Sequence, residues 1–218
     1  MNAGSGLAAL RREAEGCRRC PLYKDATRTV FGEGKPGAAL MLIGEQPGDR
    51  EDLAGRPFVG PAGGVLDRAL ADAGWNREAV YVTNAVKHFK FRMRGKRRLH
   101  QKPDAYEIER CRWWLDRERV LVAPRLMLAL GATAARALLG RTVTISRTRG
   151  KVIELTEPAA PLMVTVHPSY LLRIRDARDK EIEYGRFVAD LAAAKAWLKE
   201  NAAIELANPP KTRPATRG

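Results

Sequence analysis

The chain has 218 residues, 45% of them hydrophobic and 29% charged, so it can bury a core without disulfide cross-links. Its 39 Lys and Arg exceed its 25 Asp and Glu, and the net charge of +14 indicates a polyanionic partner, nucleic acid before an acidic membrane surface. No segment approaches roughly 18 consecutive apolar residues and the N-terminus lacks a signal-peptide pattern, which predicts a cytoplasmic protein without a membrane span.

Four short apolar segments alternate with helical patterns along the chain. The apolar segments read as buried parallel strands and are Ala39–Ile43, Val80–Asn84, Leu126–Leu130 and Leu162–Val166. The helical patterns are Pro61–Ala73, a segment from the capping pair Asp104 and Glu107 to about Arg119, Gly131–Leu139, and Tyr184–Leu198. Thr148–Leu155 is expected to form a small hairpin arm. The alternation predicts an α/β fold with a four-stranded parallel sheet.

Three of these strands end in polar or glycine-rich motifs, where such sheets carry their functional sites. The motifs are Gly44–Gly48, Asn84–His88 and His167–Ser169, whereas the Gly131 that ends the third strand is interpreted as structural. Glu45 indicates a base or a stabiliser of positive charge, with a solvated loop carboxylate as the alternative. Phe58 is either a core residue or a stacking platform.

Cys17 and Cys20 are two residues apart and precede a proline, a spacing that lets both sulfurs bind one metal centre. Cys111 offers a third ligand and His88 a fourth, and both iron and zinc accept such a set. The alternatives are buried or reactive cysteines, and a His88 that lies on the surface or faces DNA. An odd number of cysteines argues against a disulfide framework.

The segment 87–102 contains eight Lys or Arg and no acid, interleaved with Phe89, Phe91 and Met93. A run of charges is often only a solvated face. Because this one follows a strand end and carries aromatic residues, we interpret it as a DNA-contacting loop. Residues 207–218 are expected to be a disordered basic tail after a single domain of residues 1–206.

Together these motifs resemble the uracil-DNA glycosylase superfamily, and its iron–sulfur family four in particular. The resemblance covers roughly residues 17–198 and includes Gly44–Gly48, Gly55–Gly60, Asn84–Lys87, His167–Ser169 and the three cysteines. It implies a three-layer α/β/α fold, one [4Fe-4S] cluster, and uracil-containing DNA, single- or double-stranded, as the substrate of a monomer. His88 replaces the family-four cysteine, which points to Cys17, Cys20, His88 and Cys111 as cluster ligands.

Two departures from family four resemble the UdgX branch, which joins itself covalently to uracil-containing DNA. They are His88 in place of the cysteine and an inserted basic loop that ends in His100, and Gln46 in the first motif adds to the resemblance. The resemblance implies that Phe58 stacks on uracil, Asn84 reads its edge and His167 stabilises the leaving uracil anion. His100 would then attack C1′ of the sugar with Glu45 as its orienting partner, while Gln46 helps fix the site.

DNA contacts are predicted for side chains of the basic loop and of the segment after His167, namely Lys87, Lys96, Arg97, Arg98, Ser169, Tyr170 and Leu171. The expected setting is a bacterial nucleoid. Three alternatives remain: a conventional multi-turnover glycosylase, a non-enzymatic iron–sulfur sensor of single-stranded DNA, and a zinc-dependent RNA-binding module. On the residues alone, His100 is equally a phosphate-contacting histidine.

Overall fold

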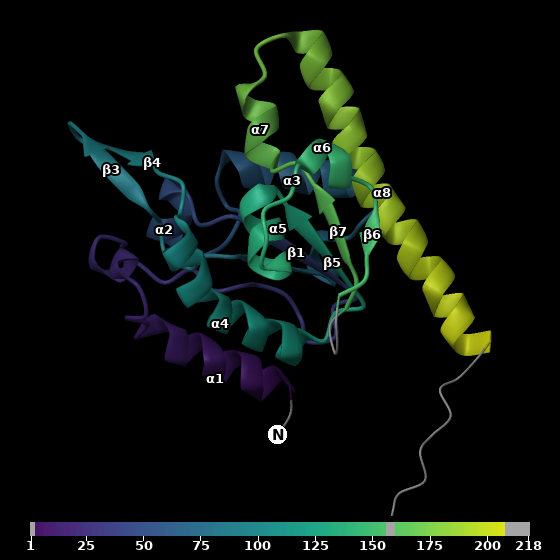
Figure 1. The fold of residues 1–218 in the computed structure, drawn as a ribbon, viewed down its shortest axis with the longest axis horizontal. Coiled ribbons are helices and arrows are strands. Elements are labelled where there is room, and N and C mark those ends of the chain that lie inside the picture. Colours follow the sequence, from purple (N-terminus) through teal and green to yellow (C-terminus); the bar gives the residue numbers. More distant parts are fainter. Residues whose placement is uncertain (1–2, 156–159, 208–218) are drawn as a thin grey trace, which may run out of the picture.

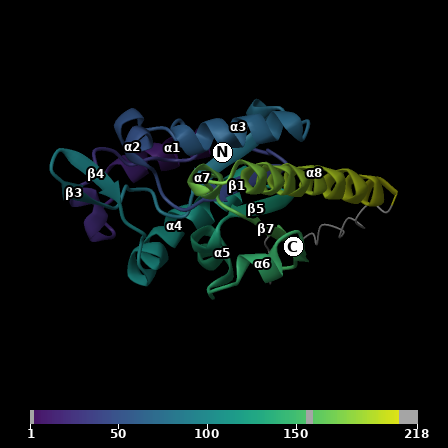
Figure 2. The same ribbon diagram turned by 90° about the horizontal axis from the view of Figure 1, so that it is seen from above.

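The computed structural model describes residues 3–155 and 160–207. A twisted sheet forms the middle layer, and its strands lie in the order β2 (Val80–Asn84), β1 (Leu40–Gly44), β5 (Leu126–Leu130), β7 (Leu162–Thr165) and β6 (Val152–Ile153). One face of this sheet is covered by helices α3 (Pro61–Asp72) and α8 (Ala177–Ala207), and the other by helices α4 (Ala105–Val122) and α5 (Ala132–Leu139), as Figure 2 shows. The predicted three-layer α/β/α architecture is therefore confirmed. No helix in the described part of the chain is long and apolar enough to cross a bilayer.

Four of the strands are parallel and coincide closely with the predicted apolar segments (Figure 1). They are β1 (Leu40–Gly44), β2 (Val80–Asn84), β5 (Leu126–Leu130) and β7 (Leu162–Thr165). Every residue of these strands is buried, because helices cover both faces of the sheet.

A fifth strand, β6 (Val152–Ile153), pairs antiparallel with the edge strand β7. The predicted hairpin arm at Thr148–Leu155 is therefore wrong as a self-contained hairpin. The segment instead contains the end of the short helix α6 (Ile145–Thr148) and then adds its extended part to the sheet. The edge of β7 explains the difference. Without β6, the backbone N–H and C=O groups along that edge would have no partner strand, and pairing with β6 satisfies them.

The predicted helices form, and Asp104 and Glu107 make the expected reciprocal capping bonds at the start of α4. Helix α1 was not predicted and packs against α4 through the core that Leu10, Ala14 and Leu115 share. The helices are α1 (Ala3–Glu15), α2 (Asp49–Ala54), α3 (Pro61–Asp72), α4 (Ala105–Val122), α5 (Ala132–Leu139), α7 (Pro168–Arg173) and α8 (Ala177–Ala207), with 3₁₀ turns at Pro21–Lys24 and Arg77–Ala79.

The basic segment is a β-hairpin rather than a loop. Its strands β3 (Phe91–Arg94) and β4 (Arg97–His100) pair antiparallel and project from the domain beside α2 (Figure 1). Gly95, with a φ of +58°, and Lys96 form the two-residue turn, and a positive φ is what such a turn requires. His100 thus stands at the base of a ladder, opposite Phe91, instead of in an irregular segment.

Helix α8 runs well beyond the predicted Tyr184–Leu198 and ends at Ala207. Apart from Ala207, the predicted tail lies outside the described residues. The proposed division into residues 1–206 and a tail stays a prediction.

Candidate active site

A cavity of about 1570 Å³ opens at the carboxyl ends of β1, β2, β5 and β7. This volume exceeds the roughly 300–1,000 Å³ of most small-molecule pockets, so a nucleotide can enter together with parts of its neighbours. β1 has β2 on one side and β5 on the other, and such a branching point is where open α/β sheets bind ligands. Eight of the predicted site residues line this cavity, namely Glu45, Gln46, Phe58, Asn84, His100, His167, Ser169 and Tyr170.

Phe58 and Asn84 form one wall of the cavity, against the end of β1. Gly44 is opposite Asn84 in the sheet, and a Cβ on it would lie 2.3 Å from Asn84 Oδ1 and 2.6 Å from Phe58 Cζ. Gly63 leaves similar room, since its Cβ would lie 1.8 Å from the carbonyl oxygen of Phe58. Phe58 itself has a φ of +55°, an unfavourable conformation for a residue with a side chain, and such strain concentrates at functional sites.

Glu51 holds together the two loops that carry Glu45 and Phe58. Its carboxylate accepts hydrogen bonds from the backbone N–H of Gly48 at 3.1 Å and of Gly60 at 2.7 Å. A Cβ on Gly60 would lie 2.9 Å from this carboxylate, so glycine lets the loops approach. The hydrogen bonds from these backbone N–H groups to Glu51 therefore fix the position of the cavity wall before any ligand binds.

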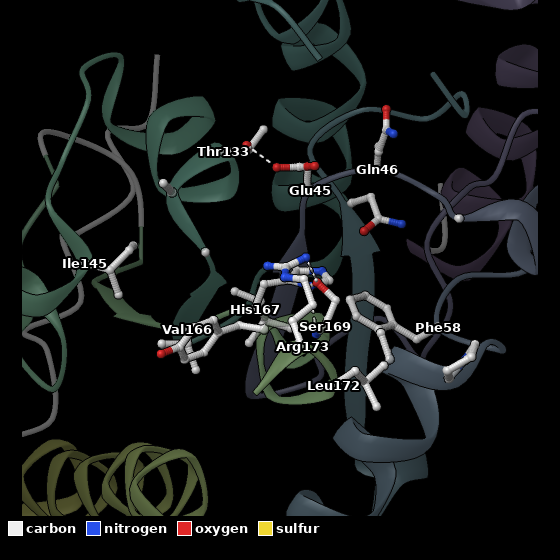
Figure 3. A pocket seen from close by; sticks show the side chains of 18 of the residues that line it. Glu45, Gln46, Phe58, Thr133, Ile145, Val166, His167, Ser169, Leu172 and Arg173 are labelled. Carbon is white, nitrogen blue, oxygen red and sulfur yellow. Dashed lines mark hydrogen bonds between the residues drawn. The ribbon is translucent and has the colours of Figure 1, made fainter. Parts of the chain in front are cut away.

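His167 caps helix α7 and lies beside Phe58, with ring centroids 6.1 Å apart and planes inclined by 29° (Figure 3). The backbone N–H of Ser169 donates to His167 Nδ1 at 3.2 Å. Because a backbone N–H can only donate, Nδ1 is an acceptor and the proton of the neutral ring is on Nε2. Burial lowers the pKa of His167 to about 4, so the ring is neutral at pH 7 and offers one N–H donor.

Glu45 connects the ends of β1 and β5 with the hairpin. Oε1 lies 3.3 Å from His100 Nε2. Oε2 accepts a hydrogen bond from the Thr133 hydroxyl, as Figure 3 shows. Burial opposes ionisation of Glu45, but the bonds from His100 and Thr133 outweigh it and lower the pKa of the carboxyl. Glu45 is therefore a carboxylate at pH 7, facing an imidazole that is 50% exposed at the cavity mouth.

Thr133 is a residue that sequence reasoning missed, because the third strand end was interpreted as structural. Gly131, with a φ of +94°, passes so close to β7 that a Cβ would lie 3.1 Å from His167 Cβ. Thr133 follows it in the first turn of α5 and reaches Glu45. Nothing in the local pattern marks this threonine, since its partner is 88 residues away.

Gln46 lines the cavity, yet its amide is occupied by the base of the hairpin. Nε2 donates to the carbonyls of Lys90 at 3.2 Å and Gln101 at 3.0 Å, and Oε1 accepts from Lys90 N at 3.1 Å. These contacts attach both hairpin strands to the residue after Glu45. Gln46 thus places His100 next to Glu45, and in this arrangement both of its N–H donors are already engaged.

Two of the side chains predicted to contact DNA, those of Lys87 and Leu171, are buried in this structure. The ammonium group of Lys87 is completely buried against Glu118, where no phosphate can reach it. Leu171 is 1% exposed and belongs to the same buried core cluster as Leu66, whereas its neighbours Tyr170 and Leu172 are exposed. The helical turn of α7 decides which of these adjacent residues faces outward.

Arg98 is engaged by carboxylates, whereas Lys96 and Arg97 are exposed. The Arg98 guanidinium contacts Asp49 Oδ1 and Asp52 Oδ2, each at 2.6 Å, and is 16% exposed. It also lies over the Phe91 ring at 5.1 Å. Arg98 therefore attaches the hairpin to α2, which leaves the tip to carry the available positive charge.

The four predicted metal ligands are buried, and all three cysteines are free thiols. Trp114 Nε1 donates to Cys17 Sγ at 3.0 Å and Lys87 N donates to Cys111 Sγ at 3.1 Å. Burial, and to a smaller extent the neighbouring Cys20 and Cys17, raise the pKa of Cys111 to about 12, although Lys87 acts in the opposite direction.

Among the described residues, no three His, Cys, Asp or Glu side chains converge tightly enough for a single metal ion. His88 bonds Thr29 Oγ1 at 2.9 Å through Nε2, while its buried Nδ1 has no hydrogen-bond partner in the described structure. Three thiols with N–H donors on two of the sulfurs, and an unpaired imidazole nitrogen, are a donor set that fits a cluster, which holds its ligands farther apart than one ion does.

The fold and the cavity define a protein of the uracil-DNA glycosylase type. A family model described as the uracil DNA glycosylase superfamily matches residues 31–192, and the chain belongs to this superfamily. It is 35% identical over 185 residues to the type-4 uracil-DNA glycosylase of Thermotoga maritima, covering 84% of this chain and 90% of that protein. It is 33% identical over 190 residues to the type-4 enzyme of Archaeoglobus fulgidus, with 84% and 92% covered. Identity to the type-5 uracil-DNA glycosylase of Pyrobaculum aerophilum is 30% over 183 residues, 76% of each chain.

Proposed function

We propose that this protein excises uracil from DNA and then joins its own His100 to C1′ of the sugar. The first half rests on superfamily membership and on relatives named uracil-DNA glycosylases. The second half rests on one observation, the placement of His100 Nε2 3.3 Å from the Glu45 carboxylate at the mouth of the cavity. This arrangement is the UdgX-like feature of the chain.

Uracil is bound and released by the inner wall of the cavity. The nucleotide leaves the base stack, Phe58 stacks on uracil, and the buried Asn84 amide pairs with its polar edge. His167 donates its Nε2–H to uracil O2, where negative charge gathers as the N1–C1′ bond breaks and both electrons leave with the base. A neutral donor in a buried site stabilises that charge without reorganisation of solvent.

His100 supplies the nucleophile to the electron-poor C1′. Its nitrogen facing Glu45 donates a proton, and the other ring nitrogen keeps the lone pair that forms the N–C1′ bond. The ring becomes cationic as this bond forms, and the Glu45 carboxylate either stabilises that charge or accepts the proton. Because the histidine occupies the position from which water would attack, the protein acts once on each uracil.

The hairpin tip supplies attraction to the DNA backbone. Lys96 and Arg97 are exposed there and contact phosphates, while Ser169 and Tyr170 meet the strand beside the flipped nucleotide. Gln46 and Arg98 act on the hairpin instead of on DNA, since their polar groups are engaged by protein. The proposed active form is a monomer.

The cluster ligands we propose are Cys17, Cys20, His88 and Cys111, holding one [4Fe-4S] cluster. When bound, the cluster supplies a cross-link between the N-terminal segment, the turn after β2 and helix α4, because breaking an N-glycosidic bond transfers no electron from the protein. Two observations support this assignment: the two N–H···S bonds, and a His88 Nδ1 that has no hydrogen-bond partner among the described residues.

The test is a denaturing gel of the protein mixed with uracil-containing and thymine-containing oligonucleotides. We expect a one-to-one adduct that survives SDS and heat with the uracil strand alone, mapped by peptide sequencing to His100. His100→Ser should lose the adduct and still release uracil, since Asn84 and His167 remain. Uracil released in excess of wild-type protein would select a conventional glycosylase, and binding without release would select a sensor.

A further inference from the structure

A completely buried ion pair lies next to Asn84, the residue proposed to read uracil. Neither of its two residues lines the cavity or is a proposed cluster ligand. Lys87 Nζ and Glu118 Oε2 are in contact, and both side chains are completely buried. Burying two charges costs several kcal/mol per ion, and apolar residues at such positions are often no less stable. Stability therefore does not explain why this ion pair is present. The other contacts of the two side chains indicate a different role.

Besides Lys87, Glu118 accepts hydrogen bonds from three residues, Gly32 and the β2 residues Tyr81 and Thr83. Oε1 accepts from Gly32 N and from the Tyr81 hydroxyl, each at 2.9 Å, and both carboxylate oxygens accept from the Thr83 hydroxyl at 3.0–3.1 Å. Burial and the nearby Glu118 carboxylate raise the pKa of Tyr81, so its hydroxyl stays a donor. The carboxylate is therefore fully coordinated by hydrogen bonds and cannot shift without breaking several of them.

Lys87 connects the Glu118 carboxylate to the end of β2. Its ammonium group donates to Thr83 Oγ1 at 2.7 Å and to the carbonyl oxygen of Asn84 at 2.8 Å. Asn84 is the residue whose amide faces the cavity, so the buried charge holds the backbone of the uracil-reading residue directly.

The same turn holds the position of Glu45. Ala85 N donates to Gly44 O at 2.9 Å and Val86 N donates to Glu45 O at 3.0 Å. A change in the turn after β2 is thereby transmitted to the segment that carries the carboxylate next to His100. Displacements of about an ångström at such groups are enough to cost two orders of magnitude in rate.

We propose that Glu118, acting through Lys87, is a positioning residue for uracil recognition. It holds the Asn84 backbone at the depth where the side-chain amide meets the base. This inference rests on the proposed function, because it assigns the network to the uracil-reading turn of that site.

The experiment compares Glu118→Gln, Lys87→Met and the double variant, measuring the single-turnover rate of uracil release and the thermal unfolding midpoint. Glu118→Gln leaves an uncompensated buried ammonium group and should lower both. The double variant removes both charges while the new amide oxygen still accepts from Gly32 N and Tyr81, so its unfolding midpoint should return toward wild type. Its rate should stay about tenfold low, because Asn84 O has lost its donor. Recovery of the rate together with stability would overturn the proposal.

A double-mutant cycle with Asn84→Ala tests the route of the effect. If Glu118 acts through the Asn84 amide, Glu118→Gln should slow uracil release by less than about twofold in the Asn84→Ala background. The same fold-loss in both backgrounds would refute the inference. Wild-type protein that releases no uracil would instead refute the proposed function, so the two failures are distinguishable. Iron content measured for each variant shows whether Lys87→Met has displaced the neighbouring His88.

Discussion

The Glu45→Gln variant is the most direct probe of how the covalent step works. The substitution keeps the size of the side chain and an acceptor for the Thr133 hydroxyl, but removes the negative charge beside His100. The charge matters because the attacking imidazole becomes cationic as it bonds to C1′. We expect uracil-dependent adduct formation to slow while DNA binding is unchanged.

The size of the effect follows from the 3.3 Å between Glu45 Oε1 and His100 Nε2. A unit charge pair at this distance is worth about 1.3 kcal/mol in bulk water and about 5 kcal/mol at an effective dielectric constant near 20. His100 is 50% exposed, so solvent screening places the contribution in the lower part of this range. About 2 kcal/mol corresponds to roughly a 30-fold slower adduct-forming step.

The assay is a quench-flow time course of the SDS-stable adduct at pH 7, with protein in excess over a uracil-containing oligonucleotide. The matched control is Glu109→Gln, the same chemical change on the exposed side of α4, which should leave the rate unaltered. An unchanged adduct rate for Glu45→Gln would refute the electrostatic role of Glu45. Equal loss of DNA affinity and adduct rate would show that the carboxylate acts in binding instead.

Three further measurements check other parts of the structure. Arg98→Gln should lower the free energy of unfolding by about 2 kcal/mol because the buried Asp52 loses its cation. Arg97→Gln, the adjacent exposed control, should change stability by less than about 0.5 kcal/mol but reduce the salt dependence of DNA binding by about one unit; equal destabilisation by the two would contradict the ion-pair assignment. Burial lowers the pKa of His167 to about 4, so as pH falls below about 6.5 the unfolded chain takes up a proton that the folded protein does not. The free energy of unfolding should fall by up to about 1.4 kcal/mol per pH unit down to about pH 4. Denaturant titrations at a series of pH values should show a weaker dependence of this free energy on pH for His167→Asn than for wild type. Under chelator challenge, His88→Ala should lose iron faster than His88→Cys, and equal retention would remove His88 from the ligand set.

The sequence by itself determined the four parallel strands, the main helices between them and the location of the cavity. Continuous aliphatic segments predict parallel strands because both faces of such a sheet are covered, and the start of α4 follows from a capping pair that acts over three residues. The motifs after the strands point to one edge of the sheet for the same reason. Glu118 carried a signal that could have been noticed, since it lies on the apolar stripe of α4 with Cys111, Trp114 and Leu115.

Only the tertiary structure decided which charges and apolar groups are available to a ligand. The basic segment contains three residues that the sequence does not distinguish but the structure does. Lys87 is buried against Glu118, Arg97 is exposed, and Arg98 is paired with Asp52. Thr133 reaches a carboxylate 88 residues away. Burial and ion pairing depend on the partner that the fold brings near, and a partner distant in sequence leaves no periodic or local signal in the segment it will contact.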